Sequence, residues 1–443
     1  MAGVSWILRN VRLLLAEGER EGDAWIDKGR WAAIGRVPDR ARGLNLEGKG
    51  AYLLPGLIDT HVHFREPGLT HKGNFYTESR AALAGGVTTV FDMPNTLPPT
   101  TTLARWEAKK QQILGRSWVN FALYFGATLD NATEIVRLDP KQVPGVKVFL
   151  ASSTGELLVD SEAVVEHLAQ VSPVRLVFHS ERQAIIEAAA AQWGGKDWDE
   201  VPDLHLRRRP PEACVASTRW LLGLAKHSPI PFHILHITTA AEVELLRQRP
   251  PNVSAETCPV YLTWSAADFV LYRNLLKCNP SLKQEADRIA LWQGLQEGVL
   301  EVVGTDHAPH TWAEKQQPYE AAPAGVPAHG YLLPWLWTIG CAWGVDLGFW
   351  VEKMVYAPAR LWRLQARGPI QEGYWADAVL FNPRGQTWVP PPGSPYHYSR
   401  CAWSPFQGRT LAGEVQAVWV NGALSFWHGY FCGSPAGQPV VFA

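Results

Sequence analysis

The sequence lacks the features that mark secreted or membrane-spanning proteins. It has six cysteines, and none of them forms a C-x-x-C pair. Scattered cysteines of this kind indicate free thiols in a reducing compartment, not a disulfide framework. No apolar run reaches the ~18 residues of a membrane span, and the N-terminus lacks the basic-then-apolar order of a signal peptide. We therefore expect a soluble, cytoplasmic protein with no membrane partner.

The chain also has no excess of positive or negative charge. The chain has 41 Lys and Arg against 42 Asp and Glu, which gives a formal net charge of -1. This balance predicts no binding to nucleic acid or to a membrane surface. The 443 residues, 47% of them hydrophobic, are enough for a large core. The 21 tryptophans are unusually many, and we assign most of them to packing.

Between residues 54 and 364, short apolar strands alternate with helical stretches. The eight candidate strands are residues 57–63, 88–93, 120–125, 146–150, 176–179, 232–236, 253–257 and 302–306. The helical stretches are residues 76–84, 105–115, 161–170, 181–192, 211–226 and 240–248. Eight strands that alternate with helices predict an α/β fold of the (β/α)8 TIM-barrel type. The alternative is an open, doubly wound sheet, which would not readily gather residues from five strands at one point.

Both ends of the chain follow a different pattern, in which short strands are separated by turns. The candidate strands are residues 6–9, 24–27, 31–34, 368–381 and 415–421. Each end is too small and too rich in strands to be stable alone. We therefore predict a small β-sandwich domain built jointly from residues 1–52 and 368–443, with the barrel over residues 53–367.

The first motif that suggests chemistry is G-L-I-D-T-H-V-H-F-R-E-P, residues 56–67. Alternate side chains of a strand share a face, so Asp59, His61 and His63 point the same way. Two neutral imidazoles can bind one divalent ion such as zinc. Arg65 follows where the strand opens into a loop, and its fork of donors suits a bound carboxylate. H-V-H alone is equally compatible with a strand end that binds nothing.

Further candidate ligands end the later strands. They are Lys147, His179, His236 and Asp306. Barrel active sites lie at the C-terminal ends of the strands, so these residues and the two histidines of H-V-H could hold two metal ions. Two ions a few ångströms apart can hold a hydroxide between them and polarise a carbonyl oxygen.

Each of these later residues also has a structural interpretation. Taken singly, His179 and His236 would be satisfied core histidines, and Lys147 a salt-bridged lysine. An ammonium has only donors, so Lys147 could bridge two ions only after carbamylation. We leave out His233 and His307, because each should face away from the site.

Seven segments of the barrel together resemble the dihydroorotases of the amidohydrolase superfamily. They are P-G-L-I-D-T-H-V-H-F-R-E-P-G (55–68), A-G-G-V-T-T-V-F-D-M-P-N-T (84–96), K-V-F-L-A-S-S-T-G (147–155), F-H-S-E (178–181), L-H-I-T (235–238), K-C-N-P-S-L-K (277–283) and T-D-H-A-P-H-T-W-A-E-K (305–315). The pattern G-x-I-x-x-G-x-x-A-D at residues 368–377 is similar to the β-domain of that superfamily.

The resemblance implies a binuclear zinc site and a substrate site beside it. The implied zinc ligands are His61, His63 and Asp306 for one ion, His179 and His236 for the other, and Lys147, as N6-carboxylysine, between them. The implied substrate contacts are Arg65, Asn95 and His310 for a carboxylate, and Asn279 in the same pocket. Asp306 is the implied catalytic acid–base group. The implied reaction is the reversible cyclisation of N-carbamoyl-L-aspartate to L-dihydroorotate, a step of pyrimidine (UMP) synthesis.

Two departures and two alternatives remain open. Some dihydroorotases use an aspartate in place of the bridging lysine, and residues 321–331 lack the G-L-E-T of many relatives. One alternative is another cyclic amidase, an allantoinase or hydantoinase. The other is an inactive homologue that acts as a scaffold for aspartate carbamoyltransferase. For partners we expect a small-molecule substrate and other copies of this chain, with aspartate carbamoyltransferase as a further candidate.

Overall fold

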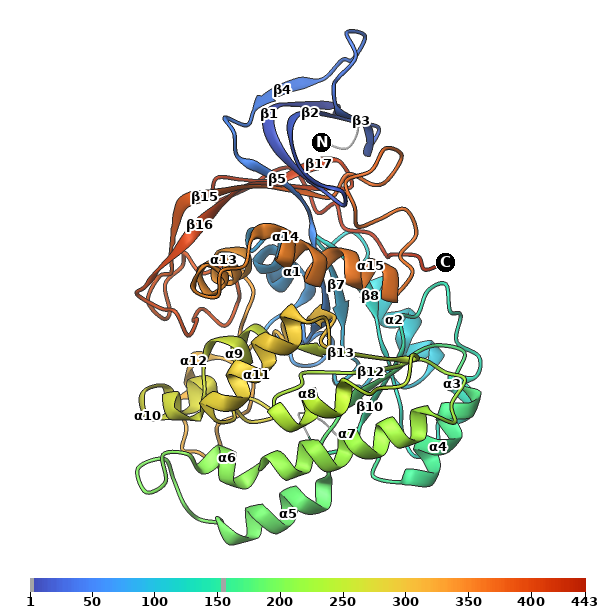
Figure 1. Ribbon diagram of the computed structural model, residues 1–443, viewed down its shortest axis with the longest axis vertical. Coiled ribbons are helices and arrows are strands. Elements are labelled where there is room, and N and C mark those ends of the chain that lie inside the picture. Colours follow the sequence, from blue (N-terminus) through green and yellow to red (C-terminus); the bar gives the residue numbers. More distant parts are fainter. Residues whose placement is uncertain (1–3, 153–156) are drawn as a thin grey trace.

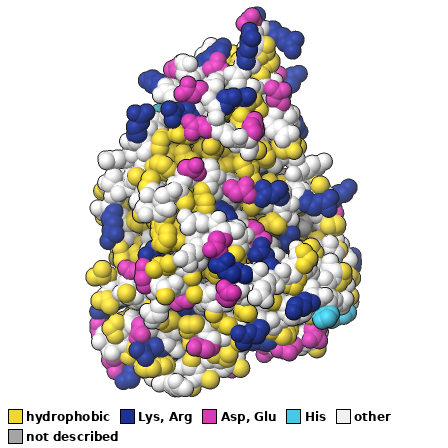
Figure 2. Space-filling model, viewed as in Figure 1, with side chains coloured by type: hydrophobic (Ala, Val, Ile, Leu, Met, Phe, Trp, Pro, Cys, Tyr) yellow, Lys and Arg dark blue, Asp and Glu magenta, His cyan; other side chains and the backbone are white. Residues whose placement is uncertain are grey.

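The computed structural model describes residues 4–152 and 157–443, so the end of the segment 147–155 lies outside the described residues. The molecule has two parts, a barrel and a β-sheet that covers one end of it (Figure 1). Charges of both signs are interspersed over the face seen in Figure 2, as the near-zero net charge predicts. In the described part of the chain, no helix is long and apolar enough to cross a membrane.

Parallel strands occupy eight positions around the barrel. They are β6 (Leu57–Val62), β7 (Val87–Asp92), β8 (Asn120–Leu123) continued by β9 (Phe125–Gly126), β10 (Val146–Phe149), β11 (Leu176–His179), β12 (Phe232–Ile234), β13 (Val253–Thr257) and β14 (Val302–Val303). Strands β6 to β8 form one sheet and β9 to β14 another, and only Tyr124 separates β8 from β9. A parallel bridge between Val62 and His307 joins the last position to the first. The prediction of a closed barrel is confirmed, and the open sheet is excluded.

Helices surround the barrel, and short helices also lie within the loops that connect its strands. They are α1 (Phe75–Ala84), α2 (Leu103–Ile113), α3 (Ala132–Ile135), α4 (Glu162–Val171), α5 (Gln183–Gln192), α6 (Leu204–Arg208), α7 (Pro211–Ala225), α8 (Ala240–Leu246), α9 (Pro259–Thr263), α10 (Phe269–Tyr272), α11 (Glu285–Gln296), α12 (Trp312–Lys315), α13 (Leu332–Ala342), α14 (Leu347–Val351) and α15 (Ala357–Leu361). Side-chain caps fix where several begin: Thr239 and Glu242 form a reciprocal capping box at the start of α8. Thr311 and Glu314 do the same at α12.

The two chain ends form a single nine-stranded sheet. Its strands are β1 (Trp6–Leu15), β2 (Gly18–Asp27), β3 (Arg30–Gly35), β4 (Leu44–Glu47), β5 (Tyr52–Pro55), β15 (Ala378–Trp388), β16 (Thr410–Val420), β17 (Ala423–Trp427) and β18 (Tyr430–Phe431). Strand β5 lies between β1 and β15, so it joins the N-terminal strands to the C-terminal ones. One face carries its own buried cluster, which includes Trp31 and Trp419, and the other packs on the barrel core. The residue bounds of the two domains stay a prediction.

One predicted strand begins later than the sequence pattern indicated. Residues 368–377 are turns and loop, and β15 starts only at Ala378. Gly368 and Gly373 adopt φ values of +111° and +85°, which lie outside the extended conformation and suit the turns and bends at these positions. The prediction of strand for residues 368–377 was therefore wrong, because these glycines serve turns.

Candidate metal and substrate site

The structure brings the predicted ligands together at the C-terminal ends of the strands. Asp306 Oδ1 lies 3.3 Å from His61 Nε2 and 3.0 Å from His63 Nε2. The ring centroid of His236 lies 5.5 Å from that of His61 and 4.7 Å from that of His179. These five expected metal ligands therefore lie together, although they come from four positions of the barrel.

Several of these residues have backbone conformations that end their strands early. Arg65, His236 and Asp306 adopt φ values of +68°, +39° and +49°. Positive φ is uncommon for residues other than glycine, and it recurs at functional sites. Strands β12 and β14 stop at Ile234 and Val303, two or more residues before the predicted ends, because the site residues leave the strand conformation.

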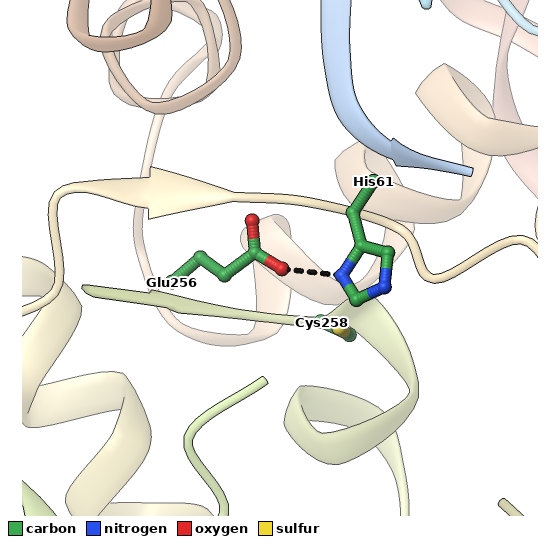
Figure 3. Close-up of side chains that lie close together, drawn as sticks. All are labelled: His61, Glu256 and Cys258. Atoms are coloured by element: carbon green, nitrogen blue, oxygen red, sulfur yellow. Dashed lines mark hydrogen bonds and ion pairs between the residues drawn. The ribbon is translucent and has the colours of Figure 1, made fainter. Parts of the chain in front are cut away.

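His61 is oriented by a buried carboxylate that the sequence analysis did not include. Glu256, at the end of β13, accepts a hydrogen bond at 2.6 Å from His61 Nδ1 (Figure 3). Its other oxygen lies 3.3 Å from both Thr60 Oγ1 and His233 Nε2. Burial alone would raise the pKa of Glu256, but His61 and His233 hold it at about 2. The ionised Glu256 keeps His61 Nε2 turned toward Asp306.

Cys258 lies close enough to His61 and Glu256 to suggest a second metal cluster (Figure 3). The hydrogen bonds argue against that interpretation. Glu256 is already occupied by three donors, and His61 uses Nδ1 for it. Burial raises the pKa of the Cys258 thiol well above its usual value, so it is not a thiolate.

Two of the remaining histidines also have one ring nitrogen held by a hydrogen bond, and the third has a nitrogen without a partner among the described residues. His63 Nδ1 bonds to Asn95 Oδ1 at 2.7 Å. His179 Nε2 bonds to Glu181 Oε2 at 2.8 Å, and Arg209 pairs with Glu181. Among the described residues, the buried His236 Nδ1 has no hydrogen-bond partner. An unsatisfied buried imidazole nitrogen beside other imidazoles and a carboxylate fits a zinc site.

The protonation states of the side chains in the pocket also fit a zinc site. Burial lowers the pKa of His63, His179 and His236, so these imidazoles are neutral, which is the form that binds metal. Burial also lowers the pKa of Lys147 to about 7. A large fraction of this amine is therefore neutral at pH 7, and only a neutral amine reacts with carbon dioxide to form a carbamate. Its Nζ lies 4.6 Å from the centroid of Phe149, a ring that contacts His179.

Arg65 and His310 lie beside this cluster and are buried. Arg65 Nε donates to Pro309 O at 3.0 Å, and Nη2 lies 3.0 Å from His310 Nε2. Burial lowers the pKa of Arg65 to about 10, so it stays protonated at neutral pH. In the described part of the chain, no carboxylate forms an ion pair with it. A buried guanidinium that forms no direct ion pair favours an anionic ligand.

Asn95 and Asn279 occupy different places in the site. Asn95 Oδ1 supports His63, a role that the sequence analysis missed. Asn279 lines a cavity of about 500 Å³ together with Lys277, Arg209 and Ala324. Its buried Oδ1 has no hydrogen-bond partner among the described residues. The cavity adjoins His310, because Ala324 O lies 3.0 Å from His310 Nε2.

The supporting carboxylates were missed because their partners are remote in sequence. Glu256 is 195 residues from His61, and nothing in the local pattern links them. Asp92, the last residue of β7, accepts from Phe64 N at 2.7 Å and pairs with Lys109, so it fixes the segment between His63 and Arg65. An acidic residue near the end of a predicted barrel strand was the available signal for both.

Glu256→Gln provides a test of this support. A neutral amide fits the same space but holds His61 less firmly, so we expect zinc affinity to fall about 10- to 100-fold. Competition with a fluorescent chelator would measure it. The exposed Glu244, on α8, offers the matched control Glu244→Gln, which should bind zinc normally. An unchanged affinity in Glu256→Gln would mean that Glu256 does not position His61.

Comparison with known proteins identifies the class. A model of the amidohydrolase family matches residues 52–189. The chain is 33% identical, over 97% of both chains, to the allantoinase of Streptomyces avermitilis. It belongs to the amidohydrolase family, and within that family to the branch that hydrolyses cyclic amides.

Similarity within that branch is shared among several activities. The dihydroorotase of Methanosarcina acetivorans is 31% identical, with 94% of this chain and 92% of the relative covered. Among solved structures, the L-hydantoinase (dihydropyrimidinase) of Arthrobacter aurescens superposes with a TM-score of 0.91 at 28% identity, with 98% and 99% of the two chains covered.

Proposed function

We propose that this protein is a dihydroorotase, which catalyses the reversible cyclisation of N-carbamoyl-L-aspartate to L-dihydroorotate. The observation that carries the proposal is the buried Arg65 guanidinium, next to His310 and the histidine cluster and without an ion pair in the described residues. Dihydroorotate carries a carboxylate on the carbon next to its ring nitrogen. Allantoin and hydantoin carry none, so they leave such a guanidinium unpaired.

We further propose that the pocket holds two zinc ions. His61, His63 and Asp306 would hold one ion and His179 and His236 the other, with carbamylated Lys147 between them. The neutral imidazoles and the unsatisfied His236 Nδ1 support this assignment. When bound, the metals supply Lewis acidity toward the amide carbonyl and a water molecule activated for attack.

The chain's own residues orient the substrate and move the proton. Arg65 and His310 hold the carboxylate, which places the ring amide over the cluster. Burial alone would raise the pKa of Asp306, but His61 and His63 hold it at about 2, so the carboxylate is ionised. Asp306 takes a proton from the attacking water and delivers it to the ring nitrogen that leaves, and the reverse transfer accompanies ring closure.

A side-by-side assay on dihydroorotate, allantoin and hydantoin tests the proposal. The purified protein should turn over dihydroorotate with a kcat/KM at least about 10³-fold above the other two, because a site built for a polar group rejects substrates that lack it. Dihydroorotate and carbamoyl aspartate can be followed by absorbance in both directions. The proposal would be contradicted if the protein turned over allantoin or hydantoin but did not turn over dihydroorotate.

Another cyclic amidase is the second candidate, favoured by the allantoinase relative and the hydantoinase neighbour. An inactive scaffold for aspartate carbamoyltransferase is the third, and it would purify without stoichiometric zinc. Assembly with other copies of the chain, association with aspartate carbamoyltransferase and a cytoplasmic location stay predictions.

A further inference from the structure

A lysine outside the implied site supports the carboxylate-binding histidine. Lys72, in the loop between β6 and α1, is only 9% exposed. Its Nζ lies 3.0 Å from His310 Nδ1 and 2.9 Å from Glu314 Oε1. The other oxygen of Glu314 accepts from Thr311 N and Oγ1 at 2.8 and 2.9 Å. Because Glu314 is anchored at the start of α12, the ammonium of Lys72 is held against the imidazole.

This contact determines where His310 carries its proton. An ammonium has only donors, so Lys72 favours His310 Nδ1 as the acceptor without a hydrogen, and the acceptor Ala324 O lies against Nε2 and not Nδ1. Burial lowers the pKa of His310 well below its usual value, and Arg65, Lys315 and Lys72 add to the effect, so the ring is neutral. A neutral ring without a proton on Nδ1 carries it on Nε2.

The Nε2 proton has an acceptor in Ala324 O, which belongs to a residue that lines the cavity of about 500 Å³. Nε2 lies 3.0 Å from Ala324 O, the acceptor available to it in the protein. It also lies 3.0 Å from Arg65 Nη2, a second donor, so this contact opposes a proton on Nε2 unless an acceptor such as a carboxylate binds to both groups. Two donors thus converge beside the histidine cluster. The indole of Trp403 donates to His310 O at 2.7 Å and holds the backbone in place.

We propose that Lys72 is a positioning residue that fixes His310 as the Nε2–H tautomer, so that His310 and Arg65 together present donors to the substrate carboxylate. The identity of the carboxylate rests on the proposed function. The tautomer does not, because it is a property of the free protein. The two parts can therefore fail separately.

The tautomer is measured first, on zinc-loaded protein without substrate. The NMR sample is deuterated and carries ¹⁵N-labelled histidine. The signals of His310 are assigned as those that disappear from the spectrum of His310→Gln. We expect the Nε2–H pattern in the wild type and in Lys72→Arg, which retains a donor. In Lys72→Met the pattern should shift toward Nδ1–H or a mixture. An Nδ1–H wild type, or a pattern unchanged in Lys72→Met, would overturn the proposal.

Kinetics then test the consequence. Lys72→Met should raise KM for dihydroorotate about tenfold, the effect of one weakened hydrogen bond to a charged group, with kcat and zinc content near wild type. Lys110→Met is the matched control, since Lys110 lies on α2 and contacts Glu107 and Gln142. It should leave KM unchanged. A drop in kcat or in zinc content instead would assign Lys72 a merely structural role.

A double-mutant cycle tests whether Lys72 affects KM through His310. Glutamine has a fixed amide donor and no tautomers, so Lys72→Met should add little to KM in a His310→Gln background. Fully additive effects would show that Lys72 does not act through His310. If the wild type fails to turn over dihydroorotate at all, the proposed function is wrong, and the NMR result still decides the tautomer.

Discussion

Arg65→Met should lower kcat/KM for dihydroorotate roughly 10²- to 10³-fold, the cost of removing one partner of a buried charge pair. Methionine fills much of the same volume and donates no hydrogen bond, so the carboxylate enters the pocket without a counter-ion. Most of the loss should appear in KM, because in the proposed complex the guanidinium would contact a part of the substrate that does not react.

Zinc content separates this effect from damage to the metal cluster. Arg65 donates to Pro309 O and contacts His310 Nε2. Neither Pro309 nor His310 is a predicted zinc ligand. Arg65→Met should therefore retain two zinc ions per chain by atomic absorption. Arg105→Met, on the exposed side of α2, is the matched control and should behave as wild type. Loss of zinc in Arg65→Met would show that the role assigned to Arg65 is wrong.

Lys147→Ala should lower kcat at least about 10²-fold, comparable to the loss of one electrostatic contact to the transition state. The substitution removes the nitrogen that would carry the carbamate and leaves a space where the side chain was. Small carboxylic acids such as acetate or propionate fit that space and supply the same two oxygens. Activity should therefore return in part as their concentration rises, and zinc content with it.

A second buried lysine provides the control for the recovery of activity by small carboxylic acids. Lys353 donates to Leu300 O, remote from the histidine cluster, and is 6% exposed. Lys353→Ala should lose stability without specific loss of kcat, and added acid should not improve it. Wild-type turnover in Lys147→Ala without acid would exclude the bridging role.

Local patterns predicted the barrel and the rim residues because both depend on short-range rules. A short apolar strand with a polar residue at its C-terminal end defines the position of His179 or His236 without knowledge of the rest of the fold. The strand bounds were less accurate where His236 and Asp306 turn to positive φ, because no residue type there signals that conformation.

The supports of the site could not be predicted, because they depend on which strands become neighbours. Glu256 reaches His61 only when the barrel closes, and Lys72 reaches His310 across 238 residues of sequence. Ser399 donates to Glu78, the partner of His307, although 321 residues separate Ser399 from Glu78. Such pairs follow from tertiary structure, and a single sequence carries no record of them.

The place of β5 in the sheet has a consequence for the order of folding. β5 runs through Gly56 directly into β6, the strand that bears His61, and its antiparallel partner is β15. On a ribosome, the first barrel strand therefore emerges long before residues 378–388 exist to pair with the segment that precedes it. Until then one side of β5 has no neighbour, and the sheet is completed only when the end of the chain returns to its beginning.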